Sequence, residues 1–130
     1  ESQSTLAFAR SMLPNLLGQS TQETKPEVVA RVQDILDAAT VDGVISLQSA
    51  MMLRPDSHED LRAFHGPVLS LRGSEDVIAT AADHAAIVTA CREASHSDIQ
   101  SAGHLTPIES PRETADAIIT FLNHIQKVSC

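Results

Sequence analysis

In the first half of the chain, hydrophobic positions recur at intervals of three and four, which is typical of helices with one apolar face. The clearest pattern follows Pro26, a residue suited to the first position of a helix. The polar stretch at residues 18–25 is expected to be a loop. The helices expected here cover residues 4–13 and 26–39, a segment capped by Thr40 or Asp42 that runs through Met51, and a last turn at residues 57–61. Pro14 is expected to end the first of them.

After Gly66 the pattern changes to a strand, a helix, a weaker strand and a last helix. Thr80 suits the N-cap of the first of these helices, and Ser110 and Pro111 suit the start of the second. The elements expected in this half cover residues 67–71, 80–93, 96–101 and 110 onward. A strand, crossover helix and second strand predict two parallel strands with a right-handed connection.

The expected fold class is therefore α/β, with helices followed by a β-α-β-α unit. A chain of 130 residues is long enough for one domain with a core. A parallel sheet of two strands is normally part of a larger sheet that is covered on both faces. We therefore expect further strands to come from a preceding segment, a separately held fragment or a second copy of the chain.

Composition excludes several classes of partner. The net charge is −8, so the phosphates of a nucleic acid would repel the chain, and three Phe with no Trp or Tyr leave few side chains for base stacking. There is no run of 18 apolar residues that would span a membrane. We expect neither nucleic acid nor membrane as a partner.

The cysteines, Cys91 and Cys130, form no disulfide framework and no zinc-binding spacing, which favours a reducing cytoplasm. The sequence starts at Glu1 without Met or an apolar leader. We expect either that a tag was removed or that this is the later part of a longer polypeptide.

Two residues with catalytic chemistry follow the two expected strands. Asp76 comes after the first strand and His104 after the second, 28 residues later. The carboxyl ends of parallel strands meet at one sheet edge, which is where ligands of such sheets bind. Topology alone therefore predicts an acid and a base on the same side of the sheet.

These residues stand in motifs that resemble the α/β-hydrolase family. The motifs are Gly73-Ser74-Glu75-Asp76, Gly103-His104, Glu109-Ser110-Pro111 and, at the end of the helical segment, Ala50-Met51-Met52-Leu53-Arg54-Pro55-Asp56-Ser57. The last of these is similar to the end of the cap in small esterases and enol-lactonase-like members. The resemblance implies a helical cap at residues 1–65 and the C-terminal β-α-β-α part of the core at residues 66–130. It also implies Asp76 as triad acid, His104 as catalytic base, and no metal or organic cofactor.

The nucleophile of such a triad is missing from this sequence. In the family a serine lies upstream in a Gly-x-Ser-x-Gly turn. Residues 18–22, Gly-Gln-Ser-Thr-Gln, lack the closing glycine. We therefore expect Asp76 and His104 to serve a serine on an N-terminal half of the same protein or on a second copy. The substrate would be a small ester, lactone or related carbonyl compound, and this chain alone would be inactive.

Two alternatives remain open for the whole chain. One is a non-catalytic module derived from a hydrolase, which associates with itself or a partner through its bare sheet edge. The other is a haloalkane dehalogenase or peroxidase of the same fold, because the residues that separate these activities are absent.

Individual residues also have competing interpretations. Glu75 is a rival for the triad acid, and Glu109 is expected to be a loop carboxylate or to lie at the positive end of the last helix. The methionines Met12, Met51 and Met52 are expected to pack the cap or to contact substrate. The other histidines are expected at the surface, namely His58, His65, His84, His96 and His124.

Overall fold

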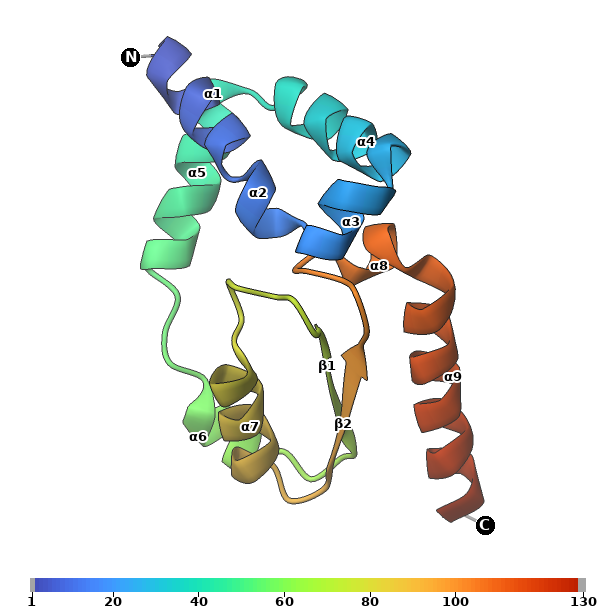
Figure 1. Ribbon diagram of the computed structural model, residues 1–130. Helices are drawn as coiled ribbons and strands as arrows, with labels where there is room; N and C mark the ends of the chain where they lie inside the picture. Colours follow the sequence, from blue (N-terminus) through green and yellow to red (C-terminus); the bar gives the residue numbers. More distant parts are fainter. Residues whose placement is uncertain (1, 129–130) are drawn as a thin grey trace.

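Figure 1 shows the computed structural model of the chain, in which residues 2–128 are described. The first half is helical, with α1 (Ser2–Ser11), α2 (Leu13–Leu16), α3 (Gln19–Thr24), α4 (Pro26–Asp37), α5 (Val41–Met52) and α6 (His58–Ala63). The second half contains β1 (Val68–Gly73), α7 (Ala81–Ala90), β2 (Ala94–Ile99), α8 (Thr106–Glu109) and α9 (Pro111–Val128). The expected change from helices to two strands joined by a helix and followed by a last helix is therefore confirmed, while α2, α3 and α8 are additional short helices.

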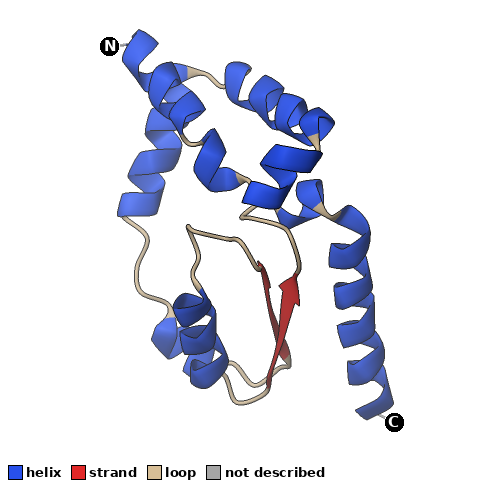
Figure 2. Ribbon diagram, in the orientation of Figure 1, coloured by secondary structure: helices blue, strands red, loops and turns tan. Residues whose placement is uncertain are grey.

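The two strands form a parallel pair in which Val68 lies opposite Ala94 and Gly73 opposite Ile99. Helix α7 packs on both strands, while α9 contacts β2 from the other side (Figures 1 and 2). Helices α1 to α5 lie beyond the carboxyl ends of the strands (Figure 1). The carboxyl ends of the strands, which Asp76 and His104 follow in sequence, therefore face the helical segment.

Local sequence signals explain where several helices begin. Pro26 occupies the first turn of α4, as predicted. The Thr40 hydroxyl accepts a hydrogen bond of 3.1 Å from the Gly43 N–H and so caps α5. Thr80 and Asp83 form a reciprocal capping box at the start of α7.

The prediction of a loop at residues 18–25 is wrong, because Gln19–Thr24 form α3. The first N–H groups of this helix are satisfied by carboxylates far away in sequence. The Gly18 N–H donates to Glu109, and the Ser20 N–H donates to Glu75. Free N–H groups at the start of a helix attract negative charge. These tertiary contacts therefore stabilise α3, for which the local sequence contains no helix signal.

Several boundaries also differ from the predictions. Helix α7 ends at Ala90 rather than at residue 93, because the Glu93 carbonyl already accepts a hydrogen bond from the Val68 N–H in the sheet. Strand β2 begins and ends two residues earlier than expected, and Ser101 follows it with a positive φ of 56°. Pro14, expected to end a helix, lies in the first turn of α2.

The buried side chains gather around the loops more than around the sheet. The fully or nearly buried apolar residues are Ala9, Leu17, Val32, Ile99 and Ala102. By contrast, Met52 and Leu53 at the end of α5 are 85% and 82% exposed, and α9 exposes Ile118, Ile119 and Leu122. Contiguous groups of such side chains, larger than those scattered singly over most protein surfaces, are typical of places where another protein segment or a ligand binds.

No helix within residues 2–128 is long and apolar enough to cross a membrane. Cys91 is a free thiol, and Cys130 lies outside the described residues.

Candidate active site

The candidate site is formed by the two loops that follow β1 and β2. The loops are held together by backbone hydrogen bonds of 2.9 Å from the Ser74 N–H to the Ile99 carbonyl and from the Glu75 N–H to the Ala102 carbonyl. Gly73 lies against this junction, where a Cβ atom would overlap the carbonyl oxygens of Ala102 and Gly103. The two loops therefore form one tightly packed unit.

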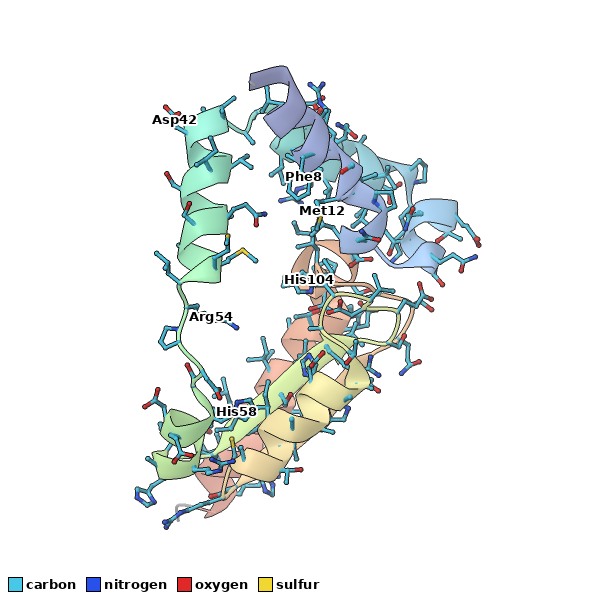
Figure 3. All side chains as sticks on the ribbon, turned by 90° about the vertical axis from the view of Figure 1, so that its left-hand side faces the viewer. Phe8, Met12, Asp42, Arg54, His58 and His104 are labelled. Atoms are coloured by element: carbon cyan, nitrogen blue, oxygen red, sulfur yellow. The ribbon has the colours of Figure 1, made fainter. Side chains whose placement is uncertain are left out.

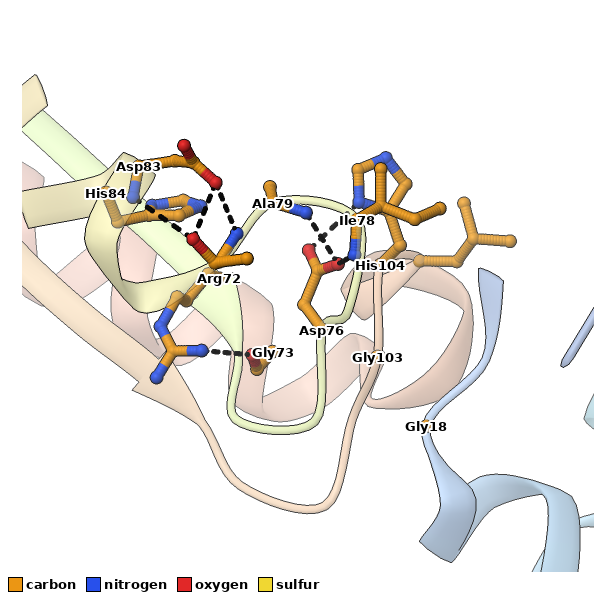
Figure 4. A network of polar contacts seen from close by, with 12 residues as sticks. Gly18, Arg72, Gly73, Asp76, Ile78, Ala79, Asp83, His84, Gly103 and His104 are labelled. Atoms are coloured by element: carbon orange, nitrogen blue, oxygen red, sulfur yellow. Dashed lines mark hydrogen bonds and ion pairs between the residues drawn. The ribbon is translucent and has the colours of Figure 1, made fainter. Parts of the chain in front are cut away.

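Asp76 and His104 meet across these loops, as topology predicted. The Nδ1 atom of His104 lies 2.9 Å from Oδ2 of Asp76 (Figure 4). The other carboxylate oxygen, Oδ1, accepts hydrogen bonds from the N–H groups of Ile78 at 2.8 Å and Ala79 at 3.0 Å. Each oxygen of Asp76 thus has its own donors, which fixes the direction in which the carboxylate faces the imidazole.

The pKa of Asp76 is lower than the ordinary value for an aspartate. Burial acts in the opposite direction, because the side chain is only 4% exposed and desolvation raises the pKa. Hydrogen bonds from the Ala79 N–H, from His104 and from the Ile78 N–H together outweigh burial. Asp76 is therefore ionised at neutral pH and acts only as an acceptor.

An ionised Asp76 determines the tautomer of His104. Because the carboxylate has no proton to donate, Nδ1 must carry the hydrogen that joins the two groups. The lone pair of Nε2 is then available, and the His104 side chain is 37% exposed. This is the arrangement of a general base that can take a proton from a hydroxyl group.

The low pKa of Asp76 predicts how stability changes with acid. A carboxyl group whose pKa is lowered by folding stabilises the fold above its unfolded value of about 4, and this stabilisation is lost as the pH falls through the folded value. We expect Asp76→Asn to cost about 1–2 kcal/mol of unfolding free energy at pH 7, because a charge-assisted hydrogen bond is lost. The deficit should disappear toward about pH 2.

Urea denaturation from about pH 7 to about pH 2 measures this difference. The stability of the wild type should fall more steeply with acid than that of Asp76→Asn. Parallel curves for the two proteins would show that the Asp76 carboxylate does not stabilise the fold.

Glu75, the rival acid, faces away from His104. Its carboxylate accepts hydrogen bonds from the N–H and the hydroxyl of Ser20, at 2.8 and 2.5 Å. Asp76, not Glu75, therefore supports the imidazole. The Ser20 hydroxyl is itself occupied by Glu75, and among the side chains that the structure describes, those of residues 6–127, no hydroxyl or thiol is hydrogen-bonded to Nε2 of His104.

Among the residues near His104, Glu109 differs most from its sequence-based prediction. It was expected in a loop, but it ends the short helix α8 and is only 2% exposed. Its carboxylate accepts hydrogen bonds from the N–H groups of Gly18, Gly103 and Leu105. The only available signal was its place in the Glu-x-Pro motif, which carries no information about these partners.

The helical segment contributes directly to the histidine loop. The His104 N–H donates to the Leu16 carbonyl at 3.0 Å, and the Lys25 ammonium donates to the Glu109 carbonyl at 2.7 Å. In Figure 3, Phe8 and Met12 of this segment lie directly above His104. Hydrogen bonds therefore join the helical segment directly to the loop that carries His104.

The remaining candidate residues form no second site. His84 is not a simple surface residue, because its Nδ1 lies 2.7 Å from the Ser70 hydroxyl, and burial, together with the nearby charges of Arg72 and His96, lowers its pKa. Met51 and Met52 are 59% and 85% exposed, so packing within the cap does not explain them. Residues 2–128 contain no group of three or more His, Cys, Asp or Glu side chains able to hold a metal ion.

Comparison of the fold with solved structures identifies its class. A thermophilic esterase from Thermogutta terrifontis, with malate bound, matches 92% of this chain at 31% identity with a TM-score of 0.86. An enol-lactonase from Burkholderia xenovorans matches 93% at 23% identity with a TM-score of 0.82, and a bromoperoxidase from Bacillus anthracis matches 91% at 19% identity with a TM-score of 0.75. No protein-family model matches the sequence, and no curated protein matches it either.

The fold is that of the α/β-hydrolases, and the chain has the architecture of their C-terminal part. It covers only 44%, 46% and 44% of the esterase, enol-lactonase and bromoperoxidase chains. The predicted fold class and family resemblance are thus confirmed.

Proposed function

We propose that this chain is the cap and C-terminal half of a serine-type hydrolase of small esters, lactones or related carbonyl compounds. The observation that carries the proposal is the contact of 2.9 Å between His104 Nδ1 and Asp76 Oδ2 at the carboxyl ends of two parallel strands. Similarity to an esterase and an enol-lactonase supports this class of substrate. The nucleophilic serine would lie on a second segment, an N-terminal half of the same protein, while a second copy of the chain could supply further strands but no such serine.

The geometry gives each residue a distinct step. Nε2 of His104 removes the proton of the serine hydroxyl as its oxygen attacks the substrate carbonyl. The same proton then passes to the leaving alcohol oxygen, which leaves an acyl-serine and a neutral imidazole. Water attacks the acyl group in the same manner and regenerates the serine. Asp76 stabilises the imidazolium in both halves of the reaction without accepting its proton.

In this proposal residues 1–65 are the cap and residues 66–130 are the core part. The position of Phe8 and Met12 above His104 supports a substrate site between cap and core (Figure 3). The exposed ends of Met51 and Met52 on α5 are further apolar side chains of the same segment. Apolar groups of this kind suit the hydrocarbon part of an ester or lactone.

Open surfaces of the core support the need for a second segment. The two-stranded sheet has no further strand on either edge within the described residues. A groove of about 450 Å³ lies between the sheet and α9, lined by residues that include Leu69, Ala117 and Phe121. In a complete parallel sheet, both edges of such strands and both faces are normally covered.

The same open surfaces favour one alternative, a non-catalytic module that self-associates or binds a partner. The similarity to a bromoperoxidase leaves peroxidase or dehalogenase chemistry of this fold as a second one. Whichever of these functions the protein has, we propose that it is located in the cytoplasm, where the Cys91 thiol stays reduced.

Hydrolysis of p-nitrophenyl butyrate by the chain, with and without the segment encoded upstream of Glu1, tests the proposal. We expect the chain alone to be no faster than buffer, because none of the described side chains places a nucleophile at His104. Together the two segments should hydrolyse the ester at least about 10⁴-fold faster than buffer. Equal rates with and without the upstream segment, or an upstream segment without a nucleophilic serine, would contradict it.

A further inference from the structure

The buried carboxylate of Glu109 has no role in the chemistry described so far. Its side chain is nearly inaccessible, and the residue is 2% exposed. Burying a carboxylate is costly unless several donors compensate it. The donors are three backbone N–H groups, and no Arg or Lys side chain is bonded to the carboxylate within the described residues.

Two of these donors flank the histidine. The Gly103 N–H lies 2.9 and 3.0 Å from the two carboxylate oxygens, and the Leu105 N–H lies 3.1 Å from Oε1. The N–H of His104 itself points the other way and donates to Leu16. The backbone N–H groups of Gly103, His104 and Leu105 are therefore all hydrogen-bonded, and Glu109 accepts from the first and the third.

The third donor connects the carboxylate to the helical segment. The Gly18 N–H donates to Oε2 at 2.8 Å. At this point the backbones of Gly18 and Gly103 approach so closely that a Cβ on either residue would overlap the other. Glu109 therefore holds the histidine loop and the start of α3 at a single point.

We propose that Glu109 is a positioning residue for His104. Its carboxylate fixes the backbone on both sides of the imidazole and so keeps Nδ1 directed at Asp76 and Nε2 directed at the nucleophile. The proposal rests on the proposed hydrolase function, because the direction of the Nε2 lone pair matters only if it accepts a proton from a nucleophile. Catalytic groups must be held within about 0.5 Å of the productive geometry, which a loop achieves only with such support.

Glu109→Gln is the sharpest variant, because the amide has nearly the same shape but offers one acceptor oxygen and adds an N–H₂ group facing backbone donors. In the ¹⁵N-labelled chain at alkaline pH, the wild type should show distinct signals for a protonated Nδ1 and an unprotonated Nε2 of His104. In the variant we expect the ratio of Nδ1–H to Nε2–H tautomers to fall about tenfold. Amide exchange at Gly103 and Leu105 should be about tenfold faster.

Glu113→Gln is the matched control, because Glu113 is exposed on α9 and its side chain makes no hydrogen bond to any of the described residues. It should keep the wild-type tautomer ratio and exchange rates. The proposal is overturned if Glu109→Gln accelerates exchange at Gly103 and Leu105 but leaves the His104 tautomer unchanged. Glu109 would then be a purely structural residue.

A measurement on the wild type decides the question if Glu109→Gln does not fold. In urea below the unfolding transition, protection of the Gly103 and Leu105 amides and the Nδ1–H signature of His104 should be lost at the same concentration. Loss of protection with an intact imidazole signature overturns the proposal. None of these readouts needs activity, so a failure of the hydrolase proposal would be seen separately, as absent ester hydrolysis.

Discussion

Replacement of His104 by alanine is expected to reduce ester hydrolysis by the two combined segments at least about 10⁴-fold, with the loss in kcat rather than in KM. In the proposed mechanism the imidazole accepts the serine proton through Nε2, because Nδ1 is bound to Asp76 and the His104 side chain is partly exposed. The proposed mechanism gives this nitrogen no part in substrate binding, so KM should change little. Steady-state kinetics with p-nitrophenyl butyrate measure both constants.

Two further variants sharpen this test. Asp76→Asn should also lower kcat by about 10⁴-fold, because an amide that donates to Nδ1 favours the wrong tautomer. His65→Ala should keep wild-type kinetics, since His65 is exposed and lies outside the site. A kcat of His104→Ala within tenfold of the wild type would refute the assignment of His104 as the base.

Gly73→Ala is expected to destabilise the chain by about 3 kcal/mol, the largest structural effect of a single methyl group in this fold. The backbone of Gly73 is not strained, since no glycine in the described part of the chain has a positive φ. The reason is space, because a Cβ would overlap the carbonyl oxygens of Ala102 and Gly103. Backbone atoms cannot swing aside, so the junction of the two loops must open.

Gly66→Ala provides the matched control. A Cβ at Gly66 would meet only the ring of Phe64, whose side chain is half exposed and free to rotate. We expect this variant to lose less than about 1 kcal/mol. Thermal and urea unfolding of both variants measure the difference, and equal stabilities would mean that the two loops are not tightly joined at Gly73.

Sequence patterns were sufficient to predict the part of this fold that depends on local chemistry. Proline and threonine signals located the starts of α4, α5 and α7. The order of strand, helix and strand predicted the parallel pair. Topology then placed Asp76 and His104 at the same sheet edge, where the structure joins them at 2.9 Å. Their catalytic role remains a prediction.

The rest of the site depends on contacts between residues far apart in the chain. Helix α3 was missed because Glu75 and Glu109 satisfy its first N–H groups from 55 and 91 residues away. Glu109 was taken for a loop carboxylate because its three donors are backbone groups, which no side-chain pattern reveals. Spacing rules describe side chains along one element and cannot identify a carboxylate that joins two loops and a helix.

The most direct measurement is covalent labelling of the upstream serine by a fluorophosphonate, which reacts with serines that a neighbouring base has activated. The readout is mass spectrometry of the upstream segment, mixed with wild-type chain, with His104→Ala, or with no partner. We expect rapid labelling only in the mixture with the wild-type chain, and labelling at least about 10³-fold slower in the other two mixtures. Equal labelling rates in all three would contradict the claim that Asp76 and His104 serve a nucleophile on another segment.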